Sequence, residues 1–406
     1  MRLLLISLDG LWEKDFSMLQ GLPYIGAMIR SGVSCANVQT IYPALTYPVH
    51  ATILTGCRPD MHGIEHNQPF SPNLKPVSRP WYWETSQIKR PTLHQFIHEK
   101  GGKTASILWP ITGKSPYIHW NFPEVLALPG ENQTLKMLRY GSALWILAME
   151  ARYGRQRKSI HQPDLDDYVA LLAEKLLLLR RPPDFLSIHL VDCDEMRHLY
   201  GADSQEAQES IKKLDQRVGK LLTELDRQRL GQDTVVALAS DHGLFDVSRP
   251  ISLDEALKKA GLGGICRAQS TGMGAYLHFV GDGTDNLERV YMFLEENRNS
   301  LGISRIYKTQ ELLKMGAGQG IRLAVEAAPD VAFVDDLTLE KQVKASHGFG
   351  PNHPAAQCLF ILKGPGIRKG VVLLEAGMED IAPTLMHALG YDMPSAQGNI
   401  LLDCFA

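Results

Sequence analysis

Short apolar runs bounded by turn residues alternate with longer helical patterns along most of the chain. Most of these short runs are continuously apolar, which is typical of strands that helices cover on both faces. The strands predicted in this way are 2–8, 103–108, 184–191, 234–239, 274–280, 330–334 and 357–362. The alternation predicts an α/β fold with a mostly parallel central sheet and helices on both of its faces.

Helical periodicity fills the intervals between the apolar runs. In 205–229, Ile211, Leu214 and Val218 recur at the spacing of one helix face. The other predicted helices are 22–31, 47–55, 91–100, 132–153, 164–180, 285–299 and 378–389.

The pattern is weakest between residues 250 and 345. A weak stretch between two well-patterned parts is typical of an insertion into a main sheet. We therefore expect one core formed by 1–250 and 346–406, with a smaller cap inserted at 251–345.

The composition is that of an ordinary globular protein. Of the 406 residues, 44% are hydrophobic and 21% are charged, and 42 basic against 45 acidic residues leave a net charge of −3. These values exclude a disordered or collagen-like chain. The charge balance gives no reason to expect a nucleic acid or an anionic membrane as partner. No apolar run approaches the roughly 18 residues of a membrane-spanning helix.

The N-terminus and the cysteines bear on the location of the protein. The apolar stretch that starts the chain ends at Asp9-Gly10, and no small-residue cleavage site follows it. The six cysteines are scattered, without a CxxC pair: Cys35, Cys57, Cys193, Cys266, Cys358 and Cys404. Such cysteines need not pair, so we expect reduced thiols and a cytoplasmic protein.

Acidic residues and histidines gather at the ends of the predicted strands. The six side chains that follow or precede a strand in this way are Asp9, Asp194, His198, Asp241, His242 and His347. The carboxyl ends of the strands are where open α/β sheets bind their ligands. Three carboxylates and three imidazoles suit Zn²⁺ or Mn²⁺ and are too rich in nitrogen for Ca²⁺.

Each of these signals alone has an ordinary structural explanation. An aspartate at a strand end often caps the next helix, SDHG alone is compatible with a turn, and a lone histidine such as His189 is expected to be a core residue. The recurrence of acid and histidine at successive strand ends favours a metal site. Without cations, three carboxylates at one sheet edge would repel one another and raise their pKa values.

Two further polar residues suit a phosphate group. Thr46 stands at the start of a helix whose first turn contains Pro48, so its hydroxyl meets unpaired backbone N–H groups and the positive end of the helix dipole. Asn67, in HGIEHN, has an amide that could donate to a phosphoryl oxygen. The alternatives are a helix cap for Thr46 and a turn residue for Asn67.

These segments resemble, in their order and local spacing, the nucleotide pyrophosphatase/phosphodiesterase family of the alkaline phosphatase superfamily. The resemblance is carried by Asp9, by PALTYPVHATILTG around Thr46, by HGIxxN, by DxxxH, by SDHG and by SHGF. The C-terminal stretch LEAGMEDIAPTLMHALGYDMPSAQGNILL also looks like that superfamily. The similarity covers essentially the whole chain and is weakest at 110–180 and 260–340.

The resemblance implies an alkaline-phosphatase-like catalytic core with two divalent metal ions, Zn²⁺ or else Mn²⁺. One metal would be held by Asp9, Thr46, Asp241 and His242, and the other by Asp194, His198 and His347. Thr46 would be the nucleophile that forms a covalent phosphothreonine intermediate, and Asn67 would donate to a phosphoryl oxygen.

The sequence departs from the family pattern at two places. Val49 stands where the family usually has asparagine, which puts an outer contact in doubt but not the nucleophile. The segment after His347 continues Gly-Phe-Gly-Pro, where the family usually shows an acid or an amide.

Charge favours a diester as substrate. Two divalent cations bring four positive charges, which three aspartates and one alkoxide cancel. A near-neutral site suits a singly charged phosphodiester better than a doubly charged monoester. No arginine lies close to Thr46 in the sequence, although Arg58 or Arg197 could reach it through the fold.

The expected activity is hydrolysis of phosphodiester or pyrophosphate bonds in a small-molecule phosphate ester or nucleotide. The alternatives are a phosphonoacetate-hydrolase-like enzyme that cleaves a C–P bond, a phosphomonoesterase, and a metal-binding module without activity. A sulfatase is disfavoured because Cys57-Arg58-Pro59-Asp60-Met61 lies after the nucleophile segment and lacks the second arginine of CxPxR.

Overall fold

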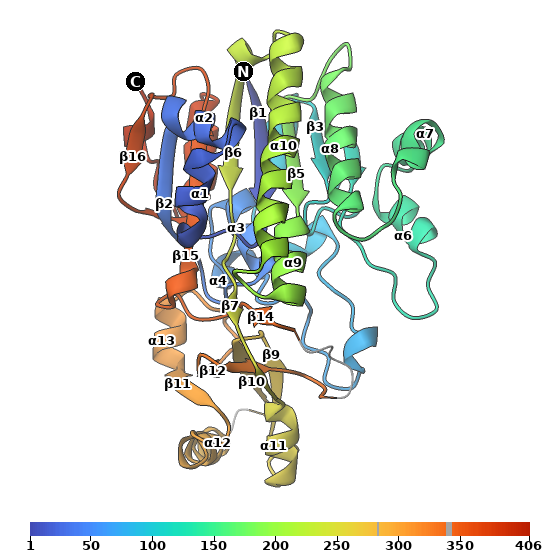
Figure 1. Cartoon of the computed structure of the whole chain (residues 1–406). Helices are drawn as coiled ribbons and strands as arrows, with labels where there is room; N and C mark the ends of the chain where they lie inside the picture. Colours follow the sequence, from blue (N-terminus) through green and yellow to red (C-terminus); the bar gives the residue numbers. More distant parts are fainter. Residues whose placement is uncertain (282–283, 338–342) are drawn as a thin grey trace.

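The computed structural model describes residues 1–281, 284–337 and 343–406. Its main element is a nine-stranded sheet (Figure 1). Along the sheet the strands are β16 (Val371–Leu373), β2 (Val33–Gln39), β15 (Gln357–Lys363), β6 (Thr234–Ala239), β1 (Arg2–Leu8), β5 (Phe185–Leu190), β3 (Thr104–Ile107) and β4 (Trp120–Phe122), with β17 (Ala376–Gly377) beside β2. Only β15 runs antiparallel to its neighbours among these described strands, so the predicted mostly parallel α/β sheet is confirmed.

Helices cover both faces of this sheet because its central strands are apolar on both sides. In β1, Leu4, Ile6 and Leu8 belong to one hydrophobic core, and Leu3 and Leu5 belong to the other. The first core is closed by α1 (Phe16–Gly21), α2 (Tyr24–Ser31), α8 (Asp164–Leu177) and α10 (Gln205–Arg227). The second is closed by α3 (Thr46–Thr55), α5 (Leu93–Glu99) and α14 (Ile381–Ala388). Figure 1 shows α8 and α10 lying across the front of the sheet.

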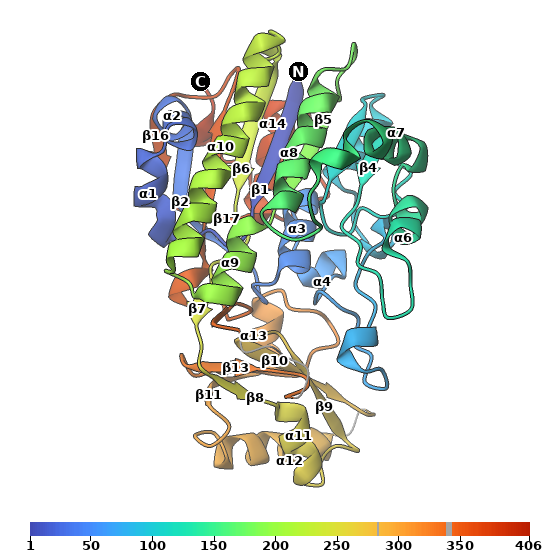
Figure 2. The ribbon, with the colours of Figure 1, turned by 45° about the vertical axis from the view of Figure 1, so that its right-hand side comes forward.

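A smaller unit lies beyond one end of the central strands (Figure 2). It is an antiparallel sheet in the order β11 (Ile303–Lys308), β12 (Leu323–Ala327), β10 (Gly274–Phe279) and β9 (Cys266–Ser270). Its helices are α11 (Leu253–Lys259), α12 (Thr284–Glu296) and α13 (Thr309–Lys314). It has a hydrophobic core of its own.

Two short strand pairs are each formed by one strand that precedes the small sheet in the chain and one that follows it. They join β8 (Arg249–Ile251) to β13 (Val331–Phe333) and β7 (Phe245–Asp246) to β14 (Ala345–Ser346). The strands predicted at 274–280 and 330–334 therefore form, but as β10 and β13 they lie outside the central sheet.

The helix predicted over 132–153 is two helices. They are α6 (Gln133–Tyr140) and α7 (Ala143–Tyr153), and Gly141 between them has extended backbone torsions. A Cβ at Gly141 would lie 2.5 Å from a side-chain carbon of Ile146 and 2.7 Å from the carbonyl oxygen of Asn121. The chain turns in a space that only glycine fits, and the apolar spacing alone did not reveal this break.

Helix α9 (Asp192–Tyr200) was not predicted because it is polar almost throughout, yet it carries Asp194 and His198. Its start is held by α8, where the buried Asp166 carboxylate accepts the backbone N–H groups of Val191 and Asp192 at 2.9 Å. Capping of this kind stabilises a helix N-terminus.

Arg217 of α10 completes this support. Its guanidinium, 1% exposed, contacts Asp192 at 2.8 Å and Asp167 at 2.9 Å. The guanidinium also lies 3.6 Å from the buried Asp166 of α8. The buried pairs with Asp166 and Asp192 tie the start of α9 to α8 and α10, so that Asp194 has a fixed place relative to the sheet. Among the described residues no helix combines the length and apolarity needed to cross a bilayer.

We expect Arg217→Ala to lower the free energy of unfolding by about 3–5 kcal/mol, because it leaves the buried Asp166 and Asp192 without their cation. Lys212→Ala is the matched control, since its pair with Glu209 on the same helix is half exposed and should contribute no more than about 1 kcal/mol. Urea denaturation followed by circular dichroism measures both. Equal effects of the two substitutions would contradict the role given to the buried network.

Candidate metal centre

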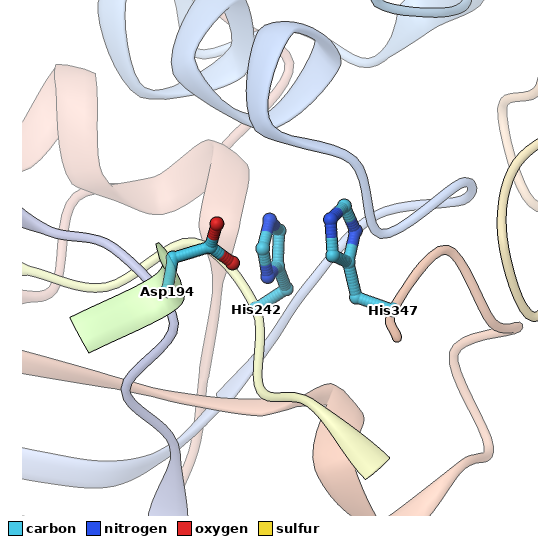
Figure 3. A group of neighbouring side chains, drawn as sticks. All are labelled: Asp194, His242 and His347. Carbon is cyan, nitrogen blue, oxygen red and sulfur yellow. The ribbon is translucent and has the colours of Figure 1, made fainter. Parts of the chain in front are cut away.

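The six predicted metal-binding carboxylates and imidazoles lie together at the carboxyl edge of the central sheet. Asp9 follows β1, Asp241 and His242 follow β6, Asp194 and His198 are on α9 after β5, and His347 follows β14. Figure 3 shows the carboxylate of Asp194 facing His242, with His347 on the far side of that ring. His347 is far from the other five residues in the sequence.

Four of the predicted ligands surround one point, and we call them the Thr46 group: Asp9, Thr46, Asp241 and His242. Nε2 of His242 lies 3.3 Å from Oδ2 of Asp241, 3.3 Å from Oγ1 of Thr46 and 3.7 Å from Oδ1 of Asp9. Ligand atoms bound at about 2.0 Å in a tetrahedron lie about 3.3 Å apart. The distances from Nε2 of His242 to the other three atoms are therefore close to those between ligands of one zinc ion.

The second predicted set, Asp194, His198 and His347, is called the Asp194 group. Nε2 of His198 lies 3.5 Å from Oδ1 of Asp194, and the rings of His198 and His347 are 5.1 Å apart. His242 stacks on His347 with ring centroids 3.8 Å apart. Potential ligand atoms of Asp194, His242 and His347 lie within 4.8 Å of one another. His242 thus lies between the two groups, although the resemblance assigned it to the first alone.

In the Asp194 group each histidine has one ring nitrogen engaged by the backbone. Nδ1 of His347 donates to the carbonyl of Ala44 at 3.0 Å, and Nδ1 of His198 donates to the carbonyl of Ala345 at 2.8 Å. This arrangement fixes the ring orientation and leaves Nε2 to bind a metal, as in many metal sites.

The carboxylates of the centre have buried oxygens that accept no hydrogen bond from the described residues. These atoms are Oδ1 of Asp9, Oδ1 of Asp194 and Oδ2 of Asp241. A buried carboxylate oxygen without a hydrogen-bond donor destabilises the fold. Three such oxygens in one place indicate that another group binds there. A pair of divalent cations satisfies them, so the residues present fit the implied metals.

The protonation states agree with this fit. Burial raises the pKa of Asp9 well above its usual value, and the negative charges of Asp241 and Asp194 raise it further. Burial lowers the pKa of His242 to about 3 and lowers the pKa of His347 well below its usual value. Both imidazoles are therefore neutral, which is the form that binds metal.

The first turn of α3 places Thr46. The helix begins at this residue, and Nδ1 of His50 donates to the Thr46 carbonyl at 2.7 Å. The other nitrogen of His50 is 2.8 Å from the hydroxyl of Ser7 in β1, so the helix start is bound to the central sheet. Val49, one of the departures from the family pattern, is fully buried in the core on this side.

Asn67 lies next to the start of α3, which carries Thr46. Its side-chain oxygen accepts the backbone N–H of Tyr47 at 3.0 Å, which leaves the amide NH₂ group to donate elsewhere. The preceding His66 donates from Nε2 to the carbonyl of Ser270 at 2.7 Å, so the small sheet holds this loop. Trp81 packs edge-on against Tyr47 at 5.1 Å.

Gly10 allows the chain after β1 to pass close to α9. Its φ is +76°, and a Cβ there would lie 2.9 Å from the Cα of Asp194. Its N–H donates to Oδ1 of Asp241 at 3.2 Å. The Asp-Gly pair that ends the first apolar run is thus required for two carboxylate segments to meet.

His189 is a buried core histidine with hydrogen-bond partners, as predicted, but one of those partners is a predicted metal ligand. It is buried in β5, and its Nε2 lies 3.0 Å from Oδ2 of Asp9. Burial alone would lower the pKa of His189, but its hydrogen bond to Asp9 and the negative charges of Asp9 and Glu124 raise it well above the usual value. Nothing in the local sequence indicated this contact, because Asp9 is 180 positions away.

Comparisons with known proteins agree with the fold. The sequence model of the type I phosphodiesterase/nucleotide pyrophosphatase family matches residues 3–355. Among solved structures, the murine ectonucleotide pyrophosphatase/phosphodiesterase 5 covers 100% of both chains with a TM-score of 0.75 and 18% identity, which shows the same fold.

Curated relatives are similar over part of their length. The human ectonucleotide pyrophosphatase/phosphodiesterase family member 1 is 25% identical over 59% of this chain, and 23% of that relative is aligned. A Caenorhabditis elegans ectonucleotide pyrophosphatase/phosphodiesterase is 23% identical over 91% of this chain and 40% of its own length. The chain thus spans less than half the length of these relatives. Because the family match covers most of the chain, the protein belongs to the type I phosphodiesterase/nucleotide pyrophosphatase family.

Proposed function

We propose that the protein is a metal-dependent hydrolase that cleaves phosphodiester or pyrophosphate bonds in nucleotide-type substrates, with Thr46 as nucleophile. The observation that carries this proposal is the position of the Thr46 hydroxyl, 3.3 Å from Nε2 of His242 and in the same group as Asp9 and Asp241. A threonine that only caps a helix has no reason to lie among carboxylates without hydrogen-bond partners.

Asp9, Thr46, Asp241 and His242 would hold one metal ion, and Asp194, His198 and His347 the other, with Zn²⁺ the best match to the ligand types. When bound, such a pair of ions lowers the pKa of a hydroxyl group and stabilises charge on phosphoryl oxygens. The neutral imidazoles of His242 and His347 are ready to bind without losing a proton.

Thr46 attacks phosphorus through Oγ1, and the bond from phosphorus to the leaving oxygen breaks. The intermediate is a phosphothreonine that still carries the rest of the substrate as an ester, while the leaving oxygen takes up the proton that the threonine hydroxyl loses. Water then hydrolyses the bond from phosphorus to Oγ1, which releases a phosphate monoester and restores the hydroxyl. The start of α3 favours this chemistry because the positive end of the helix dipole lies at Thr46, where negative charge develops.

Asn67 donates its amide N–H to a phosphoryl oxygen. Its side-chain oxygen is already engaged by the backbone of Tyr47, the residue after the nucleophile. This contact orients the amide group, so the N–H donor is already in place before the substrate binds.

The site favours a diester because the two arginines that could add positive charge are engaged elsewhere. Arg197 is buried and binds the Asp15 carboxylate and the carbonyl of Gly10. Arg58 binds Glu379. Because both guanidinium groups are paired with carboxylates, they add no positive charge for a second phosphate charge. The near-neutral site therefore favours a singly charged phosphodiester.

The relatives support a nucleotide as substrate. They are named as pyrophosphatases and phosphodiesterases of nucleotides, and one solved murine relative is described as an inactive threonine-to-alanine variant in complex with AMP. A phosphonate or a monoester is the second candidate, to be separated by assay. The segment 251–345 would act as the cap over this site.

The cytoplasmic location stays a prediction from the scattered cysteines. All six cysteines lie in the described part of the chain, and all are free and buried. Free, buried thiols are compatible with a reducing compartment.

We expect Thr46→Ala to lower kcat by several orders of magnitude while the protein keeps most of its metal, because six other ligands remain. Steady-state hydrolysis of bis-p-nitrophenyl phosphate and metal analysis of the same sample measure the two effects. Thr223→Ala, which removes a hydroxyl on α10 that donates to Gly219, is the control and should keep full activity. A Thr46→Ala enzyme with the rate of the unaltered protein would eliminate the covalent route.

We expect the zinc-loaded enzyme to have a higher kcat/KM for bis-p-nitrophenyl phosphate than for p-nitrophenyl phosphate, because Arg58 and Arg197 are engaged elsewhere and do not complement the second charge of a monoester. The two substrates share a leaving group, so the comparison isolates charge and size at phosphorus. Phosphonoacetate is assayed in parallel by release of inorganic phosphate. Faster turnover of the monoester or of the phosphonate would refute the preference.

Removal of metal should lower the melting temperature, because cations that bind only the folded state stabilise it. At a free metal concentration of one hundred times the dissociation constant, this stabilisation is about 2.7 kcal/mol. Differential scanning calorimetry of chelator-treated protein, before and after addition of ZnCl₂, measures the change. CaCl₂ is the control, because Ca²⁺ disfavours nitrogen ligands. An equal response to both salts would argue against the mixed carboxylate and imidazole site.

A further inference from the structure

His189 has acceptors on both sides of its ring. Nε2 lies 3.0 Å from Oδ2 of Asp9. Nδ1 lies 3.3 Å from the carbonyl oxygen of Leu108 and 3.7 Å from Oε2 of Glu124. The side chain is 1% exposed, so water does not compete for these contacts.

The packing around His189 fixes the plane of the ring. His50, which binds the carbonyl of Thr46, lies against it with ring centroids 4.3 Å apart. On the backbone, His189 pairs with Ser7 of β1, two residues before Asp9. The ring therefore has one orientation, and that orientation presents an N–H to Asp9.

The two oxygens of Asp9 have different surroundings. Oδ2 accepts the N–H of His189, whereas Oδ1 accepts no hydrogen bond from the described residues and lies 3.7 Å from Nε2 of His242. A carboxylate held through one oxygen can rotate little, so its other oxygen keeps its direction.

We propose that His189, backed by Glu124, is a positioning residue that holds the Asp9 carboxylate so that Oδ1 faces the other atoms of the Thr46 group. This inference rests on the proposed function, because it assumes that this group binds a metal. Residues that hydrogen-bond to metal ligands typically change metal affinity by about 10–100-fold when they are replaced.

Glu124 is part of this arrangement rather than of the metal centre. It lies beyond the ring, and its Oε2 is buried without a hydrogen bond to the described residues at standard geometry. The carboxylate attracts the ring from the side opposite Asp9, and this keeps the imidazole N–H groups aligned along the line between the two acids.

The test compares His189→Leu with His189→Gln. Leucine removes the donor, whereas glutamine carries an N–H at about the reach of Nε2, so it should rescue part of the effect. Zinc affinity is measured by competition with a chromogenic chelator, and the melting temperature of the metal-free protein reports structural damage. We expect one of the two zinc ions to bind about 10–100-fold more weakly to His189→Leu, with the other unchanged and His189→Gln in between.

His94→Leu is the matched control. His94 is equally buried, and its Nε2 contacts the hydroxyl of Ser187 on the same strand as His189, away from the proposed ligands. It should lower stability without changing either zinc affinity. If His189→Leu folds poorly, Glu124→Gln replaces it, since this side chain is partly exposed and its loss of charge should weaken the same zinc ion to a smaller degree.

The outcomes separate the two proposals. An unaltered protein that binds no zinc overturns the metal centre and the role of His189 together. An unaltered protein that binds two zinc ions, with His189→Leu or Glu124→Gln binding both as tightly, overturns the positioning role and leaves the proposed function standing. Equal weakening by His94→Leu would also overturn it, because the effect would then be general to buried histidines.

Discussion

Mutual repulsion among buried carboxylates is the constraint on which this molecule depends. Asp9, Asp194 and Asp241 meet at one edge of a sheet, and each keeps a buried oxygen that no described donor reaches. Such a cluster is unfavourable in a protein interior unless cations balance it. The surrounding structure is therefore built to hold these groups against their repulsion. Asp166 and Arg217 fix the start of α9, and the N–H of Gly10 holds Asp241.

The central strands and the residues at their ends could be predicted because short segments of the sequence indicate them. The apolar runs at 2–8, 184–191 and 234–239 are β1, β5 and β6, the three adjacent strands at the middle of the sheet. Once these strands are parallel neighbours, the polar residues at their carboxyl ends must converge. This geometry explains why Asp9 and Asp241 could be paired from the sequence, although 232 positions separate them.

The features that could not be predicted depend on contacts between distant segments. His189 carries no local mark of its partner, because an apolar strand with one histidine looks the same whether that ring meets Asp9 or a backbone carbonyl. The break at Gly141 follows from the carbonyl of Asn121, which only the folded chain brings near. Helix α9 has no apolar stripe to reveal it, since its role is to present polar groups. In each case tertiary packing, not propensity, decides the outcome.

The small sheet also takes part in the site through its backbone. The N–H of Met273 donates to the carbonyl of His347 at 2.7 Å, and the hydroxyl of Thr271 donates to the carbonyl of Gly348 at 2.9 Å. One residue earlier in the same turn, Ser270 accepts from His66, next to Asn67. A single turn of the small sheet therefore holds both a segment that carries a predicted metal ligand and the segment that carries the predicted phosphoryl donor. Because displacement of this turn would move both segments at once, the inserted segment would contribute to the geometry of the proposed reaction.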